Sequence, residues 1–219
     1  MSDITARVRD LLDHIPAHVT VIAVCKGRSA ESVSEAVDAG IAVLGQNYMV
    51  DARRVGPAVA GRASVHLIGR LRSHDVRPAN LRMFDMVQSI DSLALATRID
   101  RVSEALGRRM PVLIEVNSGR EAQKGGVVPE STEALLREIS PLTHVRVVGL
   151  MTMGPLFAEP ARYHPYFSET RQLFQHLQSL DLPGVSMVCL SMGTSDSYEV
   201  AIAEGATMVR LGTAIFGLS

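Results

Sequence analysis

The residue whose type and position first indicate chemistry is a lysine that directly follows a buried strand. Lys26 comes after the apolar run VIAVC, residues 21–25. At the mouth of a barrel its ammonium would be partly desolvated, which favours the neutral amine that attacks carbonyl groups. The position therefore suggests a Schiff-base lysine, although a lysine at a strand end is more often simply solvated.

Small and hydroxyl-bearing residues gather where the last two predicted strands end. The run 185–190 is followed by SMGTS at 191–195, and the run 206–211 is followed at once by Gly212 and Thr213. Free backbone N–H groups, hydroxyls and a helix start at one face bind phosphate. In (β/α)8 barrels the phosphate site usually follows strands seven and eight. Taken alone, Gly212 could equally be a tight turn.

These residues require parallel strands that end at one face, and the chain supplies eight apolar runs. The predicted strands cover 18–25, 41–45, 64–69, 83–89, 111–117, 145–153, 185–190 and 206–211. Helical periodicity or helix signals alternate with them over 3–14, 29–39, 48–60, 74–81, 91–106, 129–139, 161–180 and 196–205, with Asp91 and Asp196 as expected caps. The pattern and length predict one domain, 1–219, folded as an α/β (β/α)8 TIM-type barrel with an extra N-terminal helix.

Composition excludes several classes of function. The net charge of −1 and the lack of a 20-residue apolar stretch argue against nucleic-acid partners and membrane insertion. The charged start is unlike a signal peptide, and two cysteines in apolar runs suit a reducing cytoplasm. No metal is expected, because Pro16 breaks the helix that would align His14 with His18. A monomer is the simplest expectation.

Other polar residues at strand ends leave their roles open. Asn47 and Asn117 follow the second and fifth predicted strands and could line a site or only satisfy loop backbone. Arg210 lies in the eighth and could face a ligand or pair with an acid such as Glu115. These patterns support a phosphate-binding barrel, and only weakly specify pyridoxal 5′-phosphate (PLP).

A family resemblance specifies more. The segments VIAVCKGRSAESVSEAVDAGIAVLGQNY, HLIGRLRS, VQSIDSL, VLIEVNSGREAQKGGV, VVGLMTM and LSMGTSDSYEVAIAEGATMVRLGTAIFG resemble, in order, the pyridoxal phosphate homeostasis protein family, whose fold is the alanine racemase N-terminal barrel. The resemblance covers nearly the whole chain. It implies a PLP Schiff base on Lys26 and phosphate contacts from Ser195, Gly212 and Thr213, beside Ser191 and Gly193. It also implies that Arg210 faces the pyridine nitrogen and that Asn47 and Met192 line the ring.

The function implied by the resemblance is binding of PLP in intracellular vitamin B6 and amino-acid homeostasis, without robust catalysis. An arginine at the pyridine nitrogen makes the ring a weaker electron sink. The second domain that carries the opposite-face base of alanine racemase is also not expected here. One alternative is a specialised PLP-dependent racemase, epimerase or lyase acting on free amino acids. Another is a sugar-phosphate barrel enzyme with a Schiff-base lysine and no PLP.

Two segments depart from the family pattern. Gln46 stands where the family usually has glutamate in G-E-N-Y, and the usual G-x-L-Q-x-N-K becomes GRLRSHD at 69–75. These changes leave room for a substrate specific to this chain. Its candidate contacts are His66, Arg70, Arg72 and His74, although exposed charges in a loop are more often only solvated.

Overall fold

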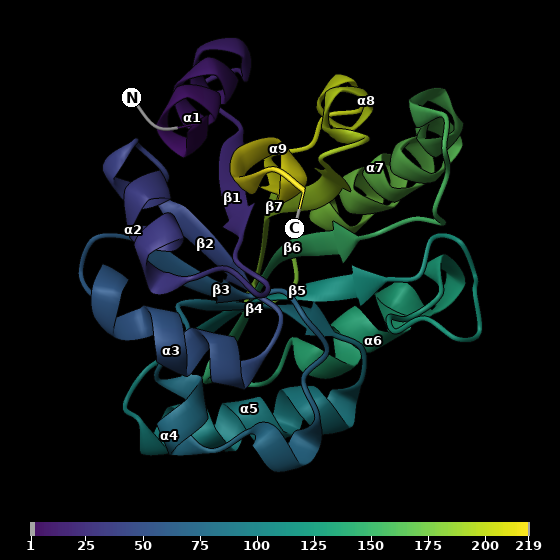
Figure 1. Cartoon of the computed structure of the whole chain (residues 1–219). Coiled ribbons are helices and arrows are strands. Elements are labelled where there is room, and N and C mark those ends of the chain that lie inside the picture. The colour runs from purple at the N-terminus through teal and green to yellow at the C-terminus, as the bar shows by residue number, and fades with distance from the viewer. Residues whose placement is uncertain (1–2, 219) are drawn as a thin grey trace.

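The computed structural model describes residues 3–218, which form a closed barrel of parallel strands in the order β1 to β8 (Figure 1). The predicted (β/α)8 barrel is confirmed. The strands are β1 (Thr20–Val24), β2 (Val43–Gln46), β3 (Ser64–Leu67), β4 (Met86–Ile90), β5 (Met110–Val116), β6 (Val145–Thr152), β7 (Val185–Thr194) and β8 (Met208–Leu211). Pairing of β1 with β8 closes the barrel.

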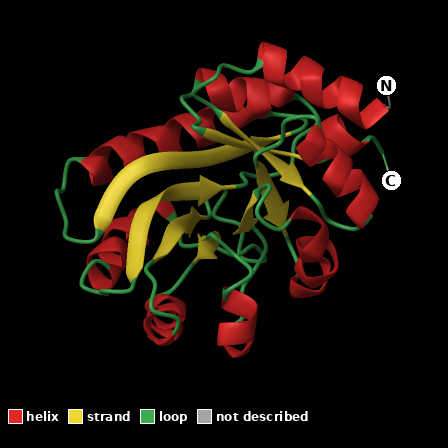
Figure 2. Ribbon diagram, turned by 90° about the vertical axis from the view of Figure 1, so that its left-hand side faces the viewer, coloured by secondary structure: helices red, strands yellow, loops and turns green. Residues whose placement is uncertain are grey.

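Helices surround the strands on the outside (Figure 2). They are α1 (Asp3–His14), α2 (Ala30–Asp38), α3 (Met49–Val59), α4 (Pro78–Leu81), α5 (Leu93–Ala105), α6 (Pro129–Ile139), α7 (His164–Gln178), α8 (Tyr198–Ala203) and α9 (Thr213–Phe216). The expected extra helix is α1, which packs against α2 and α9. The main core lies between strands and helices, because a parallel strand must bury its outer face under a helix.

The barrel interior changes from apolar to polar toward the carboxyl ends of the strands. Side chains two residues apart share one face of a strand. Three strands show the change within two residues, from Met86 to Gln88, from Leu113 to Glu115 and from Met208 to Arg210. The amino-terminal half is therefore packed for stability, and the carboxyl-terminal half carries the groups that can do chemistry.

Two predicted helix caps are wrong by one residue. Ser92, not Asp91, precedes α5, and its Oγ accepts a hydrogen bond from the Leu95 backbone N–H. Ser197, not Asp196, precedes α8. In both places an acid stands directly before a serine, so the sequence offers two adjacent cap residues and composition alone does not decide between them.

Strand β7 continues through the segment predicted to be a turn. Ser191–Thr194 stays in the strand and Thr194 pairs with Arg210 of β8. Gly193 has φ +91°, and a Cβ there would lie 2.6 Å from the Cβ of Ala201, so glycine allows the strand to pass under α8.

Three short elements also depart from the sequence-based boundaries. Residues 74–81 divide into a 3₁₀ turn (Ser73–Asp75) and α4, another turn (Pro160–Tyr163) precedes α7, and α9 was not predicted.

Gly149 has the least room for a side chain among the described glycines. The register of β6 shifts against both β5 and β7 between Val147 and Gly149. A Cβ on Gly149 would lie 1.7 Å from the Cys189 carbonyl oxygen, at φ +155°. A side chain there would push β6 and β7 apart.

We expect Gly149→Ala to lower the free energy of unfolding by at least about 3 kcal/mol, because the clash is with backbone that cannot move without breaking the sheet. Gly125→Ala is the matched control, since its Cβ meets only ordinary contacts with the Glu115 carboxylate at 3.5 Å. The control should change stability by less than about 1 kcal/mol. Urea unfolding followed by circular dichroism measures both, and equal stabilities would contradict the role assigned to Gly149.

Candidate functional site

A cavity of about 210 Å³ opens at the carboxyl ends of the strands. It brings together five residues singled out from the sequence: Asn47, Ser195, Arg210, Gly212 and Thr213. Five others also line it and were not predicted, namely Val24, Ile68, Met153, Thr194 and Asp196. They lie on or just after barrel strands, so counting strand ends could have found the cavity wall but not which side chains face it.

The Ser195 hydroxyl remains available to donate a hydrogen bond to a ligand. Its Oγ accepts hydrogen bonds from the backbone N–H groups of Gly212, at 3.1 Å, and Ala214, at 3.2 Å. A serine hydroxyl has two acceptor lone pairs and one donor. With both lone pairs used, the remaining function is donation, which is what an anionic oxygen in the cavity requires.

Arg210 is a buried cation at the floor of the cavity. Its side chain is 3% exposed, and its guanidinium donates to Ser191 Oγ and to the Thr152 carbonyl, each at 2.7 Å. Burial lowers the pKa of Arg210 to about 10, and the nearby Glu115 carboxylate opposes that effect. The guanidinium therefore stays charged at neutral pH and is fixed in direction by two short bonds.

A chain of hydrogen bonds inside the barrel holds Arg210 in place. Ser191 Oγ donates to Gln88 Oε1 at 2.8 Å, and Gln88 Nε2 donates to His66 Nδ1 at 3.0 Å. Burial lowers the pKa of His66 to about 4, so its ring is neutral and Nδ1 can accept. The function of Gln88 was missed from sequence, where its only signal was a polar residue within a short, half-polar strand.

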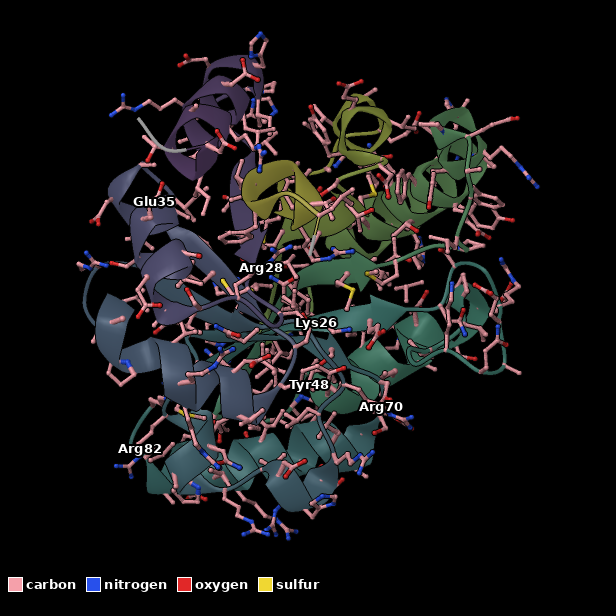
Figure 3. The ribbon with its side chains drawn as sticks, in the orientation of Figure 1. Lys26, Arg28, Glu35, Tyr48, Arg70 and Arg82 are labelled. Atoms are coloured by element: carbon pink, nitrogen blue, oxygen red, sulfur yellow. The ribbon has the colours of Figure 1, made fainter. Side chains whose placement is uncertain are left out.

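Lys26 lies in the turn that follows β1, next to the cavity wall formed by Val24. Its Nζ is 5.6 Å from the ring centroid of Tyr48, and Figure 3 shows the two side chains together near the middle of the barrel. Lys26 is exposed, so the expected partial desolvation by surrounding protein is not present. The amine is accessible from outside, which is what attack on a carbonyl requires.

Glycine and arginine fix the turn that carries Lys26. Gly27 has φ +69°, a conformation that other residues rarely adopt. Arg28 donates to the Gly217 carbonyl at 2.7 Å and stacks on Phe216, linking the turn to α9. Cys25, just before this turn, is buried. Its Sγ donates to the Ala23 carbonyl, and burial chiefly raises the pKa of the thiol to about 12.

Three predicted site residues lie behind the cavity and not on its surface. Met192 is fully buried in the core between strands and helices, on the face of β7 that turns away from the barrel interior. Ser191 lies beneath Arg210 as its hydrogen-bond acceptor. Gly193 has no side chain and so lets β7 pack closely under α8. These three residues shape and support the site without lining it.

Asn47 and Asn117, whose roles the sequence left open, differ in the structure. Asn117 Nδ2 donates to the Glu121 carbonyl, and Asn117 Oδ1 accepts from the Glu121 N–H, so this side chain organises the loop after β5. Asn47 lines the cavity and its Oδ1 is buried without a hydrogen-bond partner. A buried carbonyl oxygen of this kind costs free energy unless a ligand or solvent donates to it.

Known proteins resemble this chain over nearly its whole length. The family model of the alanine racemase N-terminal domain matches residues 1–219. The pyridoxal phosphate homeostasis protein of Pseudomonas aeruginosa is 36% identical over 99% of this chain and 93% of its own length. The chain belongs to the pyridoxal phosphate homeostasis protein family. The Escherichia coli K12 member is 33% identical over 99% of this chain and 97% of that relative.

Solved structures share the barrel of this chain. PipY of Synechococcus elongatus, solved with PLP bound, is 32% identical, covers 98% of this chain and 100% of that one, and superposes with a TM-score of 0.89. Alanine racemase from Clostridium difficile has a TM-score of 0.76 at 15% identity, and this chain covers 57% of it. That second likeness shows a shared fold only.

Within the described residues 3–218, no cluster of three or more histidine, cysteine or acidic side chains is placed to hold a metal ion. Over the same residues, no helix is long and apolar enough to cross a membrane.

Glu115 is a second ionisable group at the mouth of the barrel. It lines a separate cavity of about 450 Å³ that shares Met153 and Thr194 with the first. Burial, and then repulsion by Asp91, raises the pKa of Glu115 from 4.5 to about 6, although Arg210 and Arg70 act in the opposite direction. The carboxyl group can therefore gain or lose a proton close to neutral pH.

Because its pKa is raised in the folded protein, Glu115 lowers the free energy of unfolding as the pH rises. Between pH 4.5 and about 6 the unfolded chain has lost this proton while the folded protein still holds it, so stability falls as pH rises. The rise in pKa corresponds to about 2 kcal/mol, at about 1.4 kcal/mol per pKa unit. Glu115→Gln should therefore match the wild type near pH 4 and exceed it by about 2 kcal/mol at pH 7.5.

Urea unfolding of Glu115→Gln and wild type at pH 4, 5, 6 and 7.5 measures this difference. Glu138→Gln, at an exposed position on α6, shows what the loss of one surface carboxylate does. A stability difference for Glu115→Gln that is constant across the series would contradict the assignment.

Proposed function

We propose that this protein binds PLP as a Schiff base on Lys26 and takes part in intracellular PLP and amino-acid homeostasis without robust turnover. The observation that carries the proposal is the small cavity beside the turn of Lys26, which is lined by both the Ser195 hydroxyl and the buried Arg210 cation. Family membership and the PLP-bound PipY structure support it.

The cavity residues fit the groups of this cofactor. Ser195, Gly212 and Thr213 are assigned to the phosphate, where the hydroxyls of Ser195 and Thr213 suit an anion. Arg210 is assigned to the pyridine nitrogen and Asn47 to the ring side. Asp196 is exposed at the rim, so its charge is solvated. When bound, PLP supplies an aldehyde that reacts with amines and a ring that withdraws electrons.

The fixed cation explains why turnover is not expected to be robust. A charged guanidinium facing the pyridine nitrogen disfavours protonation of that nitrogen, and an unprotonated ring withdraws electrons less strongly. Arg210 cannot turn aside easily, because its bonds to Ser191 and Thr152 are short and buried. The residues of this site therefore suit holding the cofactor better than stabilising a carbanion.

The chain contains two lysines, Lys26 and Lys124, so the attachment point can be tested with a matched pair of variants. With added PLP, the wild type should show a visible absorption band, and borohydride reduction should fix the label on the Lys26 peptide. Lys26→Ala should lose the fixable label entirely. Lys124→Ala should keep it, because Lys124 is held by the Gly154 carbonyl and Glu121.

Absorption spectra and peptide mapping by mass spectrometry distinguish the outcomes. A label on Lys124, or a label that survives in Lys26→Ala, would show that Lys26 is the wrong residue. Protein that stays colourless with excess PLP would overturn PLP binding and favour the sugar-phosphate alternative.

A second candidate function, an amino-acid racemase, epimerase or lyase with PLP, is favoured by Glu115. Its carboxyl titrates near neutral pH and is electrostatically coupled to Arg210, so it could move a proton at the barrel mouth. Exchange of the amino-acid Cα proton for deuterium, followed by NMR in heavy water with PLP-loaded protein, separates the two functions. No exchange for any of the common amino acids would eliminate the enzyme.

A further inference from the structure

The loop after β3 presents two arginines on the same side. Along residues 69–72 burial alternates: Gly69 and Leu71 are buried, and Arg70 and Arg72 are exposed. Arg72 has an extended backbone, with φ −90° and ψ 144°. In extended chain, residues two apart point the same way. Burial of Leu71 therefore directs both guanidinium groups outward together.

Both arginines line a cavity of about 350 Å³ at the barrel mouth. Its other walls are Asn47, Tyr48, Met49, Gly69 and Asp75. Figure 3 shows Arg70 in the same region as Tyr48 and Lys26. The volume is in the range of small-ligand sites, about 300–1,000 Å³. The lining has two arginines and one carboxylate, Asp75, so positive charge predominates.

Arg70 and Arg72 make no hydrogen bond, ion pair or ring contact with any described residue, although the charge of Arg70 acts on the Glu115 carboxylate. Across residues 3–218, only four arginine side chains lack a hydrogen bond, ion pair or ring contact: Arg70, Arg72, Arg101 and Arg146. Arg101 lies on α5 and Arg146 at the amino end of β6, away from the site. Two of the four thus lie together in one cavity. The planar guanidinium matches a carboxylate with two parallel hydrogen bonds.

Asn47 joins this cavity to the proposed cofactor cavity, since it lines both. Its buried Oδ1 has no partner and can accept a hydrogen bond only from a donor such as an amine. Tyr48, beside it, offers an apolar ring within 5.6 Å of Lys26 Nζ. The walls therefore combine two carboxylate-binding groups, one acceptor for an amine and an apolar surface.

We propose that the loop after β3 makes this mouth cavity a site for an amino acid with an acidic side chain. Arg70 and Arg72 bind its two carboxylates, and Asn47 Oδ1 accepts from its amino group. This deepens the proposed function and rests on it, because the amino group then lies toward the cavity assigned to the cofactor. The site recognises the ligand whether or not the ligand is turned over.

Calorimetric titration of PLP-loaded protein with L-aspartate and L-glutamate, each beside its amide, tests the proposal. At least one acid should bind about tenfold more tightly than its amide, because the amide loses a charge-assisted hydrogen bond to arginine. Arg70→Gln with Arg72→Gln should abolish that preference. Arg101→Gln with Arg146→Gln removes the same charge elsewhere and should keep it.

Three results would overturn the proposal. They are equal binding of acids and amides by the wild type, a preference that survives in the Arg70 and Arg72 double variant, and an equal loss in the Arg101 and Arg146 double variant. The last result would mean that net charge and not this cavity sets the affinity. Thermal melting of both double variants shows that each is folded.

Titration of protein without PLP separates this proposal from the proposed function. If Lys26 takes no PLP label but the acid preference depends on Arg70 and Arg72, the amino-acid site stands and the cofactor assignment fails. If the label forms on Lys26 and the preference is absent, the cofactor assignment stands and the amino-acid site fails.

Discussion

The burial of the Arg210 cation is the constraint on which the carboxyl-terminal half of the barrel depends. A charged group inside a protein is tolerated only when its hydrogen-bonding groups are satisfied. Ser191 and the Thr152 carbonyl satisfy it directly, and Gln88 and His66 orient Ser191 in turn. This network explains why the barrel interior becomes polar at the level of Arg210, and why the floor of the cavity has a fixed charge at a fixed position.

Much of the fold could be predicted from the sequence, because a parallel barrel repeats one local signal. Each apolar run followed by a helical period, such as 111–117 and the helix after it, can be recognised as a strand and helix without its neighbours. Eight such units in a row leave few folds other than a closed parallel barrel. The residues at Ser195, Gly212 and Thr213 were also found, since strand ends meet at one face. Boundaries were less accurate where small residues continue a strand, as at Ser191–Thr194.

The rest of the site depended on contacts that sequence spacing does not contain. Ser191 and Gln88 are 103 positions apart and meet only because the barrel closes. Met192 was placed on the ring by resemblance, but the strand pleat turns it to the opposite face from Ser191. The shared direction of Arg70 and Arg72 required knowing that Leu71 is buried, and an exposed loop gives no such signal.

The position of Cys25 has a consequence for chemical selectivity. Thiols add to aldehydes as amines do, and the reactive form is the thiolate. Cys25 is the immediate neighbour of Lys26, yet it is fully buried in the core, and burial raises the pKa of its thiol to about 12. The chain thus exposes the amine and buries the adjacent competing nucleophile, so an aldehyde arriving at this turn meets nitrogen and not sulfur.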